Sequence, residues 1–322
     1  MYLVVSHKRF KNWILSGVWK DSAKAVGIKP FVVHLYGRKS INIISILKIN
    51  VLLFFAKRIV FIHHTTFLET IPYLKNYSRH CYSIYVTHIS EEDIEKLSYY
   101  ADLNVKFCVM NSLAGKRFIE KGIPEEKVSL IFGAVDRSIF YPSPTAPLAR
   151  FVLISGDCKE RKNPAKIFKI IKTMPELQFV CEGPGWSEFV KFARVPNNLR
   201  FEKIVFHEKG ELMRNATLLL NLSKEEGGPY PVLEALACGT PVLSTDVGFV
   251  SDVMPRDLGQ IIEQDTSIDK IRSALLSTLS LKAFCYSDDL LYGRYTWLEH
   301  GIKLFRIEEK ELGEASEFSD QG

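Results

Sequence analysis

The segment 218–248 carries the pattern that most restricts the fold. Leu218–Asn221 is a short apolar run typical of a buried strand, and the Gly-Gly-Pro of residues 227–229 predicts a turn. Pro231 suits the first turn of a helix, where its missing N–H costs nothing, and residues 241–244 begin another strand. A strand, a glycine turn, a helix and a second strand predict one parallel unit of an α/β sheet.

Two glutamates occupy this unit with seven residues between them, Glu226 in the loop and Glu234 on the helix. The start of a helix after a glycine turn, here Gly227 and Gly228, presents N–H groups suited to a phosphate. A carboxylate nearby can accept hydrogen bonds from two sugar hydroxyls, as acidic residues do with ribose in dinucleotide folds. The pair therefore suggests a ligand with sugars on both sides of a diphosphate. The alternative is a solvated acidic loop beside an ordinary helix surface residue.

Short apolar runs alternate with helical patterns on both sides of a proline-rich linker at 141–147. We expect strands at 3–5, 31–35, 60–63, 84–87, 107–110 and 129–131, and then at 151–154, 178–181, 218–221, 241–244 and 260–262. The alternation predicts two facing Rossmann-like domains, each a doubly wound parallel sheet. The expected domains are residues 1–142, which would bind the acceptor, and 143–294, which would bind the donor. Residues 295–322 would form a crossing helix and an acidic tail.

Bulk properties describe a cytoplasmic globular protein. The chain has 322 residues, of which 47% are apolar and 25% charged. The start lacks the features of a signal peptide, and lysines, an asparagine and an arginine interrupt the apolar stretch 41–62, so no transmembrane helix is expected there. Six cysteines are scattered without pairing or metal spacing, which fits a reducing compartment: Cys81, Cys108, Cys158, Cys181, Cys238 and Cys285.

The string from Ser223 to Gly248 closely resembles the signature of family 4 of the retaining glycosyltransferases. In that family Ser-x-x-Glu-Gly is followed by Glu-Ala, with seven residues between the two glutamates, and then by Ala-x-Gly-x-Pro-Val. The Gly-Ala-Val-Asp of residues 133–136 is similar to the family's passage out of the first domain, and Tyr-Thr-Trp at 295–297 to the start of its C-terminal helix. The resemblance covers residues 80–310 and implies GT-B architecture, with two Rossmann-like domains and a C-terminal helix returning to the first.

The resemblance implies roles for individual residues. Glu234 would bind the ribose of a nucleotide-sugar donor and Glu226 would touch the transferred sugar. Lys162 matches a lysine that holds the donor diphosphate, and we expect it to be an exposed functional cation. The family's arginine is replaced by Asp157, so Arg161 or Lys159 would have to substitute. The alternative is a solvated basic loop at the start of a helix.

Three further glycines and a histidine complete the candidate site. Gly156 belongs to the family's Gly-Arg pair, and Gly183 to a Gly-x-Gly turn near the nucleotide. Gly17 matches the second glycine of a turn that approaches the donor phosphates, although a plain turn fits it equally. His88 ends a strand and matches a histidine near the transferred sugar. The expected catalytic residues are therefore Glu226, His88 and Lys162. The expected donor-binding residues are Glu234, Gly227, Gly228, Arg161, Gly156, Gly17 and Gly183.

We expect neither a metal nor a cofactor, because the adjacent His63 and His64 have no third ligand at usable spacing. Residues 1–150 hold 21 Lys and Arg against 11 Asp and Glu, a net charge of +10. This excess suggests an anionic membrane surface, reached through a cluster at the start, although ordinary solvated lysines would also explain it. The cluster consists of Lys8, Arg9, Lys11, Trp13 and Trp19. No nucleic-acid partner is expected.

The sequence therefore predicts a retaining glycosyltransferase that moves a sugar from a nucleotide-sugar donor to a glycan or lipid-linked acceptor. Its setting would be the synthesis of a cell-surface polysaccharide, in the cytoplasm or on the inner face of the membrane. Two alternatives stay open. One is a non-catalytic nucleotide-sugar-binding module, which the departure at Asp157 motivates. The other is a nucleotide-sugar epimerase of similar architecture.

Overall fold

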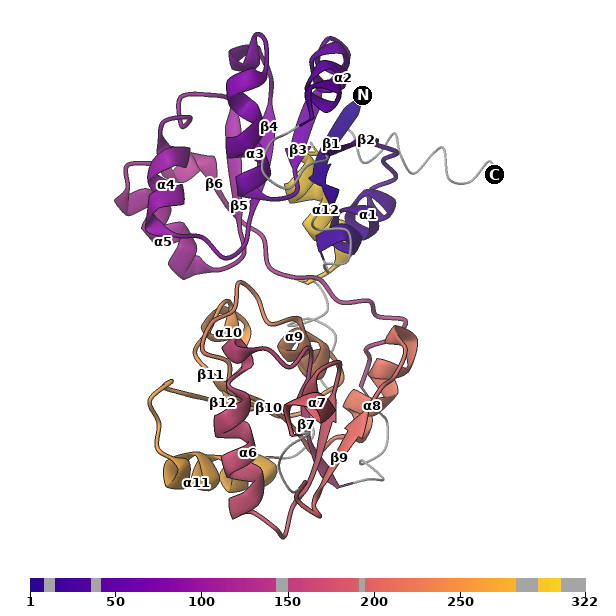
Figure 1. Cartoon of the computed structure of the whole chain (residues 1–322), viewed down its shortest axis with the longest axis vertical. Coiled ribbons are helices and arrows are strands. Elements are labelled where there is room, and N and C mark those ends of the chain that lie inside the picture. Colours follow the sequence, from indigo (N-terminus) through magenta and orange to yellow (C-terminus); the bar gives the residue numbers. More distant parts are fainter. Residues whose placement is uncertain (9–14, 36–41, 143–149, 191–194, 282–294, 308–322) are drawn as a thin grey trace. The chain divides into compact units, whose positions relative to one another are not determined.

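A computed structural model describes residues 1–8, 15–35, 42–142, 150–190, 195–281 and 295–307 (Figure 1). The chain divides into two compact units. The first unit consists of Met1–Phe132 with Trp297–Gly322, and the second of Gly133–Thr296. Residues 133–142, expected in the first domain, thus group with the second unit, and the linker residues 143–149 lie outside the described ranges. The acceptor and donor roles expected for the two domains stay predictions.

The first unit contains a six-stranded, fully parallel sheet in the order β2-β1-β3-β4-β5-β6. Its strands are β1 (Tyr2–His7), β2 (Phe31–Leu35), β3 (Arg58–Phe61), β4 (Tyr82–Val86), β5 (Val105–Val109) and β6 (Val128–Leu130). The register pairs Val4 with Val60 of β3 and Ile84 with Phe107 of β5. β4 is buried along its whole length, as parallel strands covered on both faces must be.

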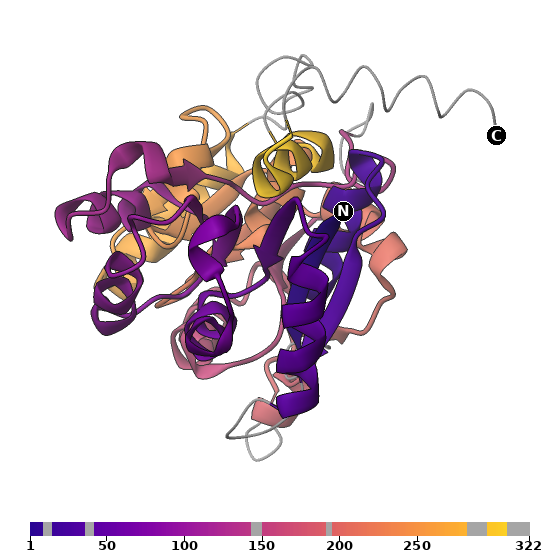
Figure 2. The same ribbon diagram turned by 90° about the horizontal axis from the view of Figure 1, so that it is seen from above.

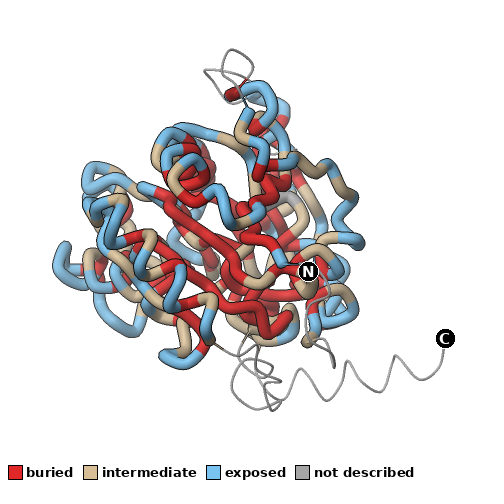
Figure 3. The backbone as a smooth tube through the Cα atoms, turned by 90° about the horizontal axis from the view of Figure 1, so that it is seen from below, coloured by how far each residue is buried: buried red, intermediate tan, exposed pale blue. Residues whose placement is uncertain are grey.

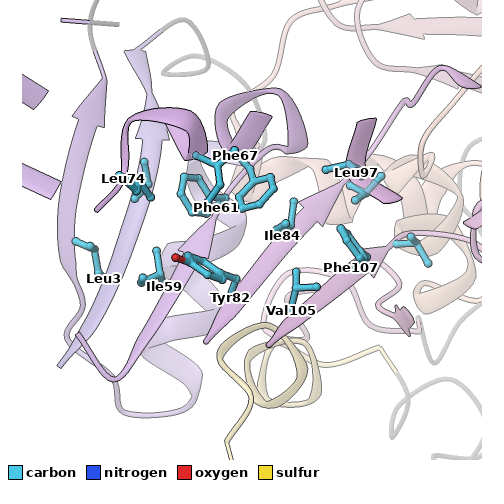
Figure 4. Packing of buried hydrophobic residues seen from close by; sticks show 14 of the residues in the cluster. Leu3, Ile59, Phe61, Phe67, Leu74, Tyr82, Ile84, Leu97, Val105 and Phe107 are labelled. Atoms are coloured by element: carbon cyan, nitrogen blue, oxygen red, sulfur yellow. The ribbon is translucent and has the colours of Figure 1, made fainter. Parts of the chain in front are cut away.

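Helices connect these strands: α1 (Leu15–Ala25), α2 (Ile43–Leu53), α3 (His64–Thr70), α4 (Glu91–Ser98) and α5 (Ser112–Glu120). A later helix, α12 (Trp297–Phe305), also belongs to this unit. Short 3-10 turns lie at Ile71–Tyr73, Tyr77–Arg79 and Glu125–Lys127. Side chains at the amino ends of four helices accept hydrogen bonds from the first turn, as preferred caps do: Asn42, His63, Ser90 and Asn111. The apolar core packs Phe61 edge-on against Phe67 and continues through Ile84 to Phe107 (Figure 4).

The last described helix, α12, belongs to the first unit and packs on α1; it is the yellow helix beside indigo α1 in Figure 2. The His300 ring is buried, with Nδ1 2.9 Å from Ser22 Oγ and Nε2 3.4 Å from the Tyr85 hydroxyl. Burial lowers the pKa of His300 to about 3, so the ring is neutral at physiological pH. The aromatic rings of Tyr2 and Phe305 meet edge-on at 5.8 Å.

The second unit contains another six-stranded parallel sheet, in the order β12-β11-β10-β7-β8-β9. Its strands are β7 (Phe151–Ser155), β8 (Gln178–Glu182), β9 (Leu199–Glu202), β10 (Leu218–Asn221), β11 (Val242–Thr245) and β12 (Gly259–Ile262). Numbered within the unit and read from the β9 edge, the order is 3-2-1-4-5-6, that of a Rossmann sheet. Figure 3 shows buried, red segments on the inside of the fold and exposed, pale-blue segments around them.

The helices of the second unit are α6 (Pro164–Thr173), α7 (Trp186–Phe189), α8 (Lys209–Asn215), α9 (Tyr230–Ala237), α10 (Val250–Val253) and α11 (Ile268–Leu279). Two 3-10 turns lie at Glu160–Lys162 and Phe206–Glu208. α6 buries Ile167, Ile170 and Ile171 against the sheet, where they join Phe179 and Leu220 in one apolar core. Removing these side chains from water is the main contribution to the stability of such a unit.

The predicted fold class, two Rossmann-like parallel sheets, is confirmed. One strand was missed: β9 is a short edge strand in which Arg200 and Glu202 interrupt the apolar pattern. The apolar stretch 41–62 forms α2 and β3. Within the described ranges, no helix is long and apolar enough to cross a membrane.

Candidate functional site

The candidate site lies in the second unit, where the strand order reverses. β7 and β10 are neighbours in the sheet although β8 and β9 lie between them in the chain, and such switch points are where open α/β sheets bind ligands. The loop after β7 and the loop after β10 meet here. The Lys224 N–H donates to the Arg161 carbonyl at 2.7 Å, which fixes one loop against the other.

The carboxylate of Glu226 is the centre of this junction. Its Oε1 lies 2.7 Å from Lys162 Nζ and 3.0 Å from Ser223 Oγ, and its Oε2 forms an ion pair with Arg161. The exposed fraction is 5% for the Glu226 side chain, 8% for Lys162 and 35% for Arg161. Three residues predicted separately from the sequence, Glu226, Lys162 and Arg161, are therefore brought together in one cluster. The expectation that Lys162 is exposed is wrong, because its side chain reaches inward to Glu226.

The protonation states of this cluster follow from burial and opposite charge. Burial alone would raise the pKa of Glu226, but Lys162 and Arg161 together lower it below its ordinary value. Burial also lowers the pKa of Lys162, and the contact with Glu226 only partly offsets this effect. A second anion at the site would favour the charged form of Lys162. The cluster is thus electrostatically suited to a negatively charged ligand.

Local backbone geometry delivers Lys162 to this position. The turn Glu160–Lys162 ends at Asn163, whose φ of 58° lies in the left-handed region, and Pro164 then starts α6. The preceding Gly156 has a φ of +107°, and a Cβ on it would lie 3.6 Å from Lys162 Cε. Asparagine and glycine are the residues that adopt these conformations most readily. The loop therefore leads from the end of β7 directly to a buried lysine.

Gly183 packs against the same loop from the end of β8. A Cβ on Gly183 would lie 2.6 Å from the Gly156 carbonyl oxygen, and its φ is +113°. The Trp186 indole N–H donates to that carbonyl at 2.8 Å. Gly183 thus permits the close approach of the two strand ends, a structural role at the candidate site. Its expected contact with the nucleotide stays a prediction.

Glu234 lies on α9 and is 4% exposed. Its Oε2 is 2.7 Å from the Nζ of Lys209, the first residue of α8. The same ammonium lies 4.0 Å from Oε2 of Glu182, which accepts a 2.6 Å hydrogen bond from Ser155 Oγ. Burial would lower the pKa of Lys209, but the facing carboxylates raise it overall, so it is charged. Sequence reasoning missed Lys209 and Glu182, because neither stands in a recognisable motif.

The loop containing Gly227 and Gly228 joins Glu226 to the start of α9. Pro229 precedes the helix and Pro231 lies in its first turn, as expected. A Cβ on Gly248 would lie 3.0 Å from the Gly227 carbonyl oxygen, so the loop after β11 supports this turn closely. The amino end of α9 is thereby held beside the Glu226 cluster.

Asp157 stands at the position where the resembled family has an arginine. Its carboxylate forms a 3.1 Å ion pair with Lys159, and both side chains are about half exposed. Arg161, by contrast, reaches Glu226. Of the two proposed substitutes for the missing arginine, only Arg161 therefore joins the buried cluster.

The two remaining candidates belong to the first unit. His88 is exposed and follows β4 by two residues, at the carboxyl edge of its sheet, as predicted. Gly17 lies inside the first turn of α1 rather than in a turn before it, because the helix already starts at Leu15. His63 caps α3 and stacks on His64 with ring centroids 4.2 Å apart. In the described part of the chain, no group of three His, Cys, Asp or Glu side chains is placed to hold a metal.

Less than half of the chain, all of it in the second unit, matches a known family. Residues 143–285, which contain this site, match the family described as "Glycosyl transferases group 1". Over these residues the chain is similar to the group 1 glycosyl transferases. The resemblance found in the string from Ser223 to Gly248 is thereby confirmed.

Curated proteins similar to this chain include two with lipid-related names. A subunit of phosphatidylinositol N-acetylglucosaminyltransferase from Arabidopsis thaliana is 27% identical over 198 residues, 54% of this chain and 41% of that protein. Alpha-galactosylglucosyldiacylglycerol synthase of Streptococcus pneumoniae is 26% identical over 161 residues, 43% of each. The chain thus spans less than half the length of these relatives.

Solved structures show the same GT-B fold over the whole chain. The lipopolysaccharide outer core galactosyltransferase WaaB superposes with a TM-score of 0.70 at 15% identity, covering 99% of this chain and all of WaaB. Anabaena Alr3699/HepE in complex with UDP-glucose superposes with a TM-score of 0.72 at 11% identity, covering all of both chains. At these identities the likeness concerns the fold.

Proposed function

We propose that this chain is a retaining glycosyltransferase that moves a sugar from a nucleotide-sugar donor to a glycan or lipid-linked acceptor. The observation that carries the proposal is the junction of Glu226, Lys162 and Arg161 at the switch point of the second sheet. Glu234 follows on α9 in the same unit. This set supplies cations for a diphosphate and carboxylates for the sugars on either side of it.

The cations act on the leaving group. Breaking the bond between sugar and phosphate builds negative charge on the departing diphosphate, and fixed cations in a site of low dielectric stabilise that charge. Lys162 and Arg161 fill this role; in the free protein Glu226 holds both. A bound diphosphate would replace part of that contact and leave Glu226 available to the hydroxyls of the transferred sugar. Because two protein cations serve the diphosphate, we propose that transfer requires no metal ion.

The nucleotide is the next part of the proposal. Glu234 would accept hydrogen bonds from the ribose hydroxyls. The Anabaena neighbour has been solved with UDP and with UDP-glucose, which makes UDP the first nucleotide to test. Three glycines lie in the two loops that carry the proposed phosphate-binding cations and Glu226: Gly156, Gly227 and Gly228. Because they lack side chains, they would let the donor phosphates approach the backbone closely. For His88 we keep the role near the transferred sugar, and for Gly17 a place near the phosphates at the amino end of α1.

The acceptor is proposed to be lipid-linked, and the protein to bind an anionic membrane surface from the cytoplasmic side. Two curated relatives are named for lipid products or substrates. The expected anchor cluster needs correction: Trp19 is 7% exposed in α1 and cannot insert into a bilayer. Arg9, Lys11 and Trp13 lie outside the described residues. Lys8 is exposed.

The apolar anchor lies instead on α2. This helix is apolar on two sides: Ile49 and Leu53 are buried against the sheet, while a second row faces solvent. The row continues past the helix end and is 57–84% exposed: Ile43, Ile44, Leu47, Val51, Phe54 and Phe55. Phe31, 58% exposed, extends it onto β2. We call these seven residues the α2 surface. A contiguous apolar surface on a globular unit marks an interaction site.

Charge favours a bilayer as the occupant of the α2 surface. Residues 1–80 hold 13 Lys and Arg against 2 Asp and Glu, a net charge of +11. Lys48 and Lys57 stand on and beside α2 and are exposed. Lysines that flank an exposed row of aliphatic and Phe side chains are typical of helices that lie in a membrane interface. Basic residues near an anionic surface contribute about 1 kcal/mol each.

A donor-turnover assay tests the proposed activity. The protein is incubated with UDP-glucose, UDP-galactose and UDP-N-acetylglucosamine, with and without lipid extract, in buffer containing EDTA. A retaining glycosyltransferase would release UDP and attach the sugar to an acceptor, and the new bond would have the same anomeric configuration as the donor. Conversion of one nucleotide sugar into another would identify an epimerase. Binding without turnover of any donor would identify a non-catalytic module.

A further inference from the structure

Side chains of alternating charge lie next to Glu234, the proposed ribose-binding residue. The glycosyl transfer proposed above gives no role to some of them. Ser155 at the end of β7 donates to Glu182 at the end of β8. The Lys209 ammonium lies between Glu182 and Glu234, at 4.0 and 2.7 Å, and is 14% exposed. Two carboxylates from distant parts of the chain thus share one cation.

Burying an ammonium such as that of Lys209 costs free energy. The cost is offset where the ammonium holds another charged group in place. An ammonium loses its hydration on burial, and burial opposes its charged form. The two facing carboxylates supply most of the compensation for this loss. Conversely, without Lys209 the carboxylates of Glu182 and Glu234 would face each other as like charges, which favours uptake of a proton by one of them. A protonated carboxyl accepts hydrogen bonds less strongly than a carboxylate.

We infer that Lys209 is a positioning residue for ribose recognition: it fixes one carboxylate oxygen of Glu234, so that the other is presented to the ribose hydroxyls. The inference rests on the proposed function, since it takes Glu234 as the ribose-binding residue. Lys209 itself does not contact the donor. Glu182 is the second carboxylate that faces Lys209, and Ser155 donates a hydrogen bond to Glu182.

The other charged groups around Lys209 do not change this expectation. Asp157, in the loop after β7, adds a weaker attraction, and Lys162 on the opposite side adds a repulsion. Cys238, one turn beyond Glu234 at the end of α9, is neutral because burial raises the pKa of its thiol to about 12. The position of the Glu234 carboxylate therefore depends mainly on Lys209, which also faces Glu182.

The test compares Lys209→Met, Glu234→Gln and the double variant Lys209→Met with Glu182→Gln, using calorimetric binding of UDP and of 2′-deoxy-UDP at pH 6.0 and 8.5. If ADP or GDP binds the wild type more tightly than UDP, that nucleotide and its 2′-deoxy analogue are used in place of UDP and 2′-deoxy-UDP. Lys169→Met, an exposed lysine on α6, is the matched control. Thermal melting of each variant records whether it folds.

We expect Lys209→Met to bind UDP about tenfold or more weakly at pH 6.0 and to recover part of the loss at pH 8.5, because repulsion between two carboxylates without their shared cation favours protonation of one of them at the lower pH. The variant should also lose the preference for UDP over 2′-deoxy-UDP. The double variant should bind UDP more tightly than Lys209→Met at pH 6.0, because the repelling carboxylate is gone. If Lys209→Met fails to fold, the double variant can still be measured in its place.

Two results would overturn the inference. Lys209→Met could bind both nucleotides like the wild type while Glu234→Gln is impaired, which would leave the proposed function intact. It could also lose equal affinity for both nucleotides at both pH values, which would make Lys209 a phosphate contact. A Glu234→Gln variant with unchanged UDP affinity would instead contradict the ribose assignment itself.

Discussion

Glu226 and Lys162 form a 2.7 Å ion pair in which both side chains are more than nine-tenths buried. The two residues come from different loops, which the reversal of strand order at β7 and β10 brings together. The lysine proposed to serve the diphosphate is thus a structural partner of Glu226 in the free protein. Substitution of Lys162 should therefore affect both stability and catalysis.

Lys162→Met should lower donor turnover by about 10²–10³-fold, the usual effect of removing one electrostatic contact to the transition state. It should also lower the melting temperature, because loss of one partner of a buried pair costs about 3–5 kcal/mol, here reduced by the remaining Arg161. Adding Glu226→Gln should restore much of the melting temperature but not turnover. A variant with normal kinetics and a low melting temperature would show a purely structural lysine.

Glu234→Gln preserves size but removes the charged acceptor for the ribose hydroxyls. A charge-assisted hydrogen bond is worth about 1.5–3 kcal/mol, so UDP affinity should fall by about one to two orders of magnitude. Isothermal titration calorimetry measures this directly. Affinity within twofold of wild type would remove Glu234 from the ribose site.

Gly183→Ala tests the close approach of the two strand ends. Its Cβ would lie 2.6 Å from the Gly156 carbonyl oxygen, in addition to the strain of a positive φ. Gly122→Ala is the matched control, since Gly122 has a φ of +83° and an added Cβ meets no atom of the described chain within 4 Å. Gly183→Ala should lower the melting temperature clearly more than Gly122→Ala. Equal losses would mean that backbone conformation alone accounts for the glycine.

The α2 surface leads to a prediction about membranes. The double variant Phe54→Ser with Phe55→Ser should reduce binding to vesicles containing anionic phosphatidylglycerol by at least about tenfold, because burial of each Phe contributes about 1.5–3 kcal/mol. Leu113→Ser, which removes a 66% exposed apolar residue of α5, should leave binding unchanged. Binding should weaken as salt rises, through screening. Equal sedimentation with neutral vesicles, or of the double variant and the wild type, would contradict the membrane proposal.

Much of the fold was predictable because buried parallel strands read as continuous apolar runs. β7 and β10 were found in this way, and the motif placed Glu226 in the loop and Glu234 on the helix. β9 was missed because an edge strand can alternate with polar residues.

Other features depend on tertiary contacts that one sequence does not encode locally. Lys209, Glu182 and Glu234 belong to three elements, and only the folded sheet brings them together. The inward direction of Lys162 depends on the left-handed turn at Asn163. An apolar run likewise does not reveal which residues of α2 face solvent. The sequence therefore identifies the motif residues, while their ionic partners require the structure.

The most direct test of the account measures whether the Glu226 cluster binds a diphosphate. Calorimetric titrations with UDP and with uridine are compared for the wild type, for Arg161→Met and for the neighbouring control Lys159→Met. The account predicts that the wild type prefers UDP over uridine by at least about tenfold, since a charge-assisted contact is worth about 1.5–3 kcal/mol. Arg161→Met should lose most of this preference, and Lys159→Met should keep it. Equal binding of UDP and uridine by the wild type, or an unchanged preference in Arg161→Met, would contradict the central claim.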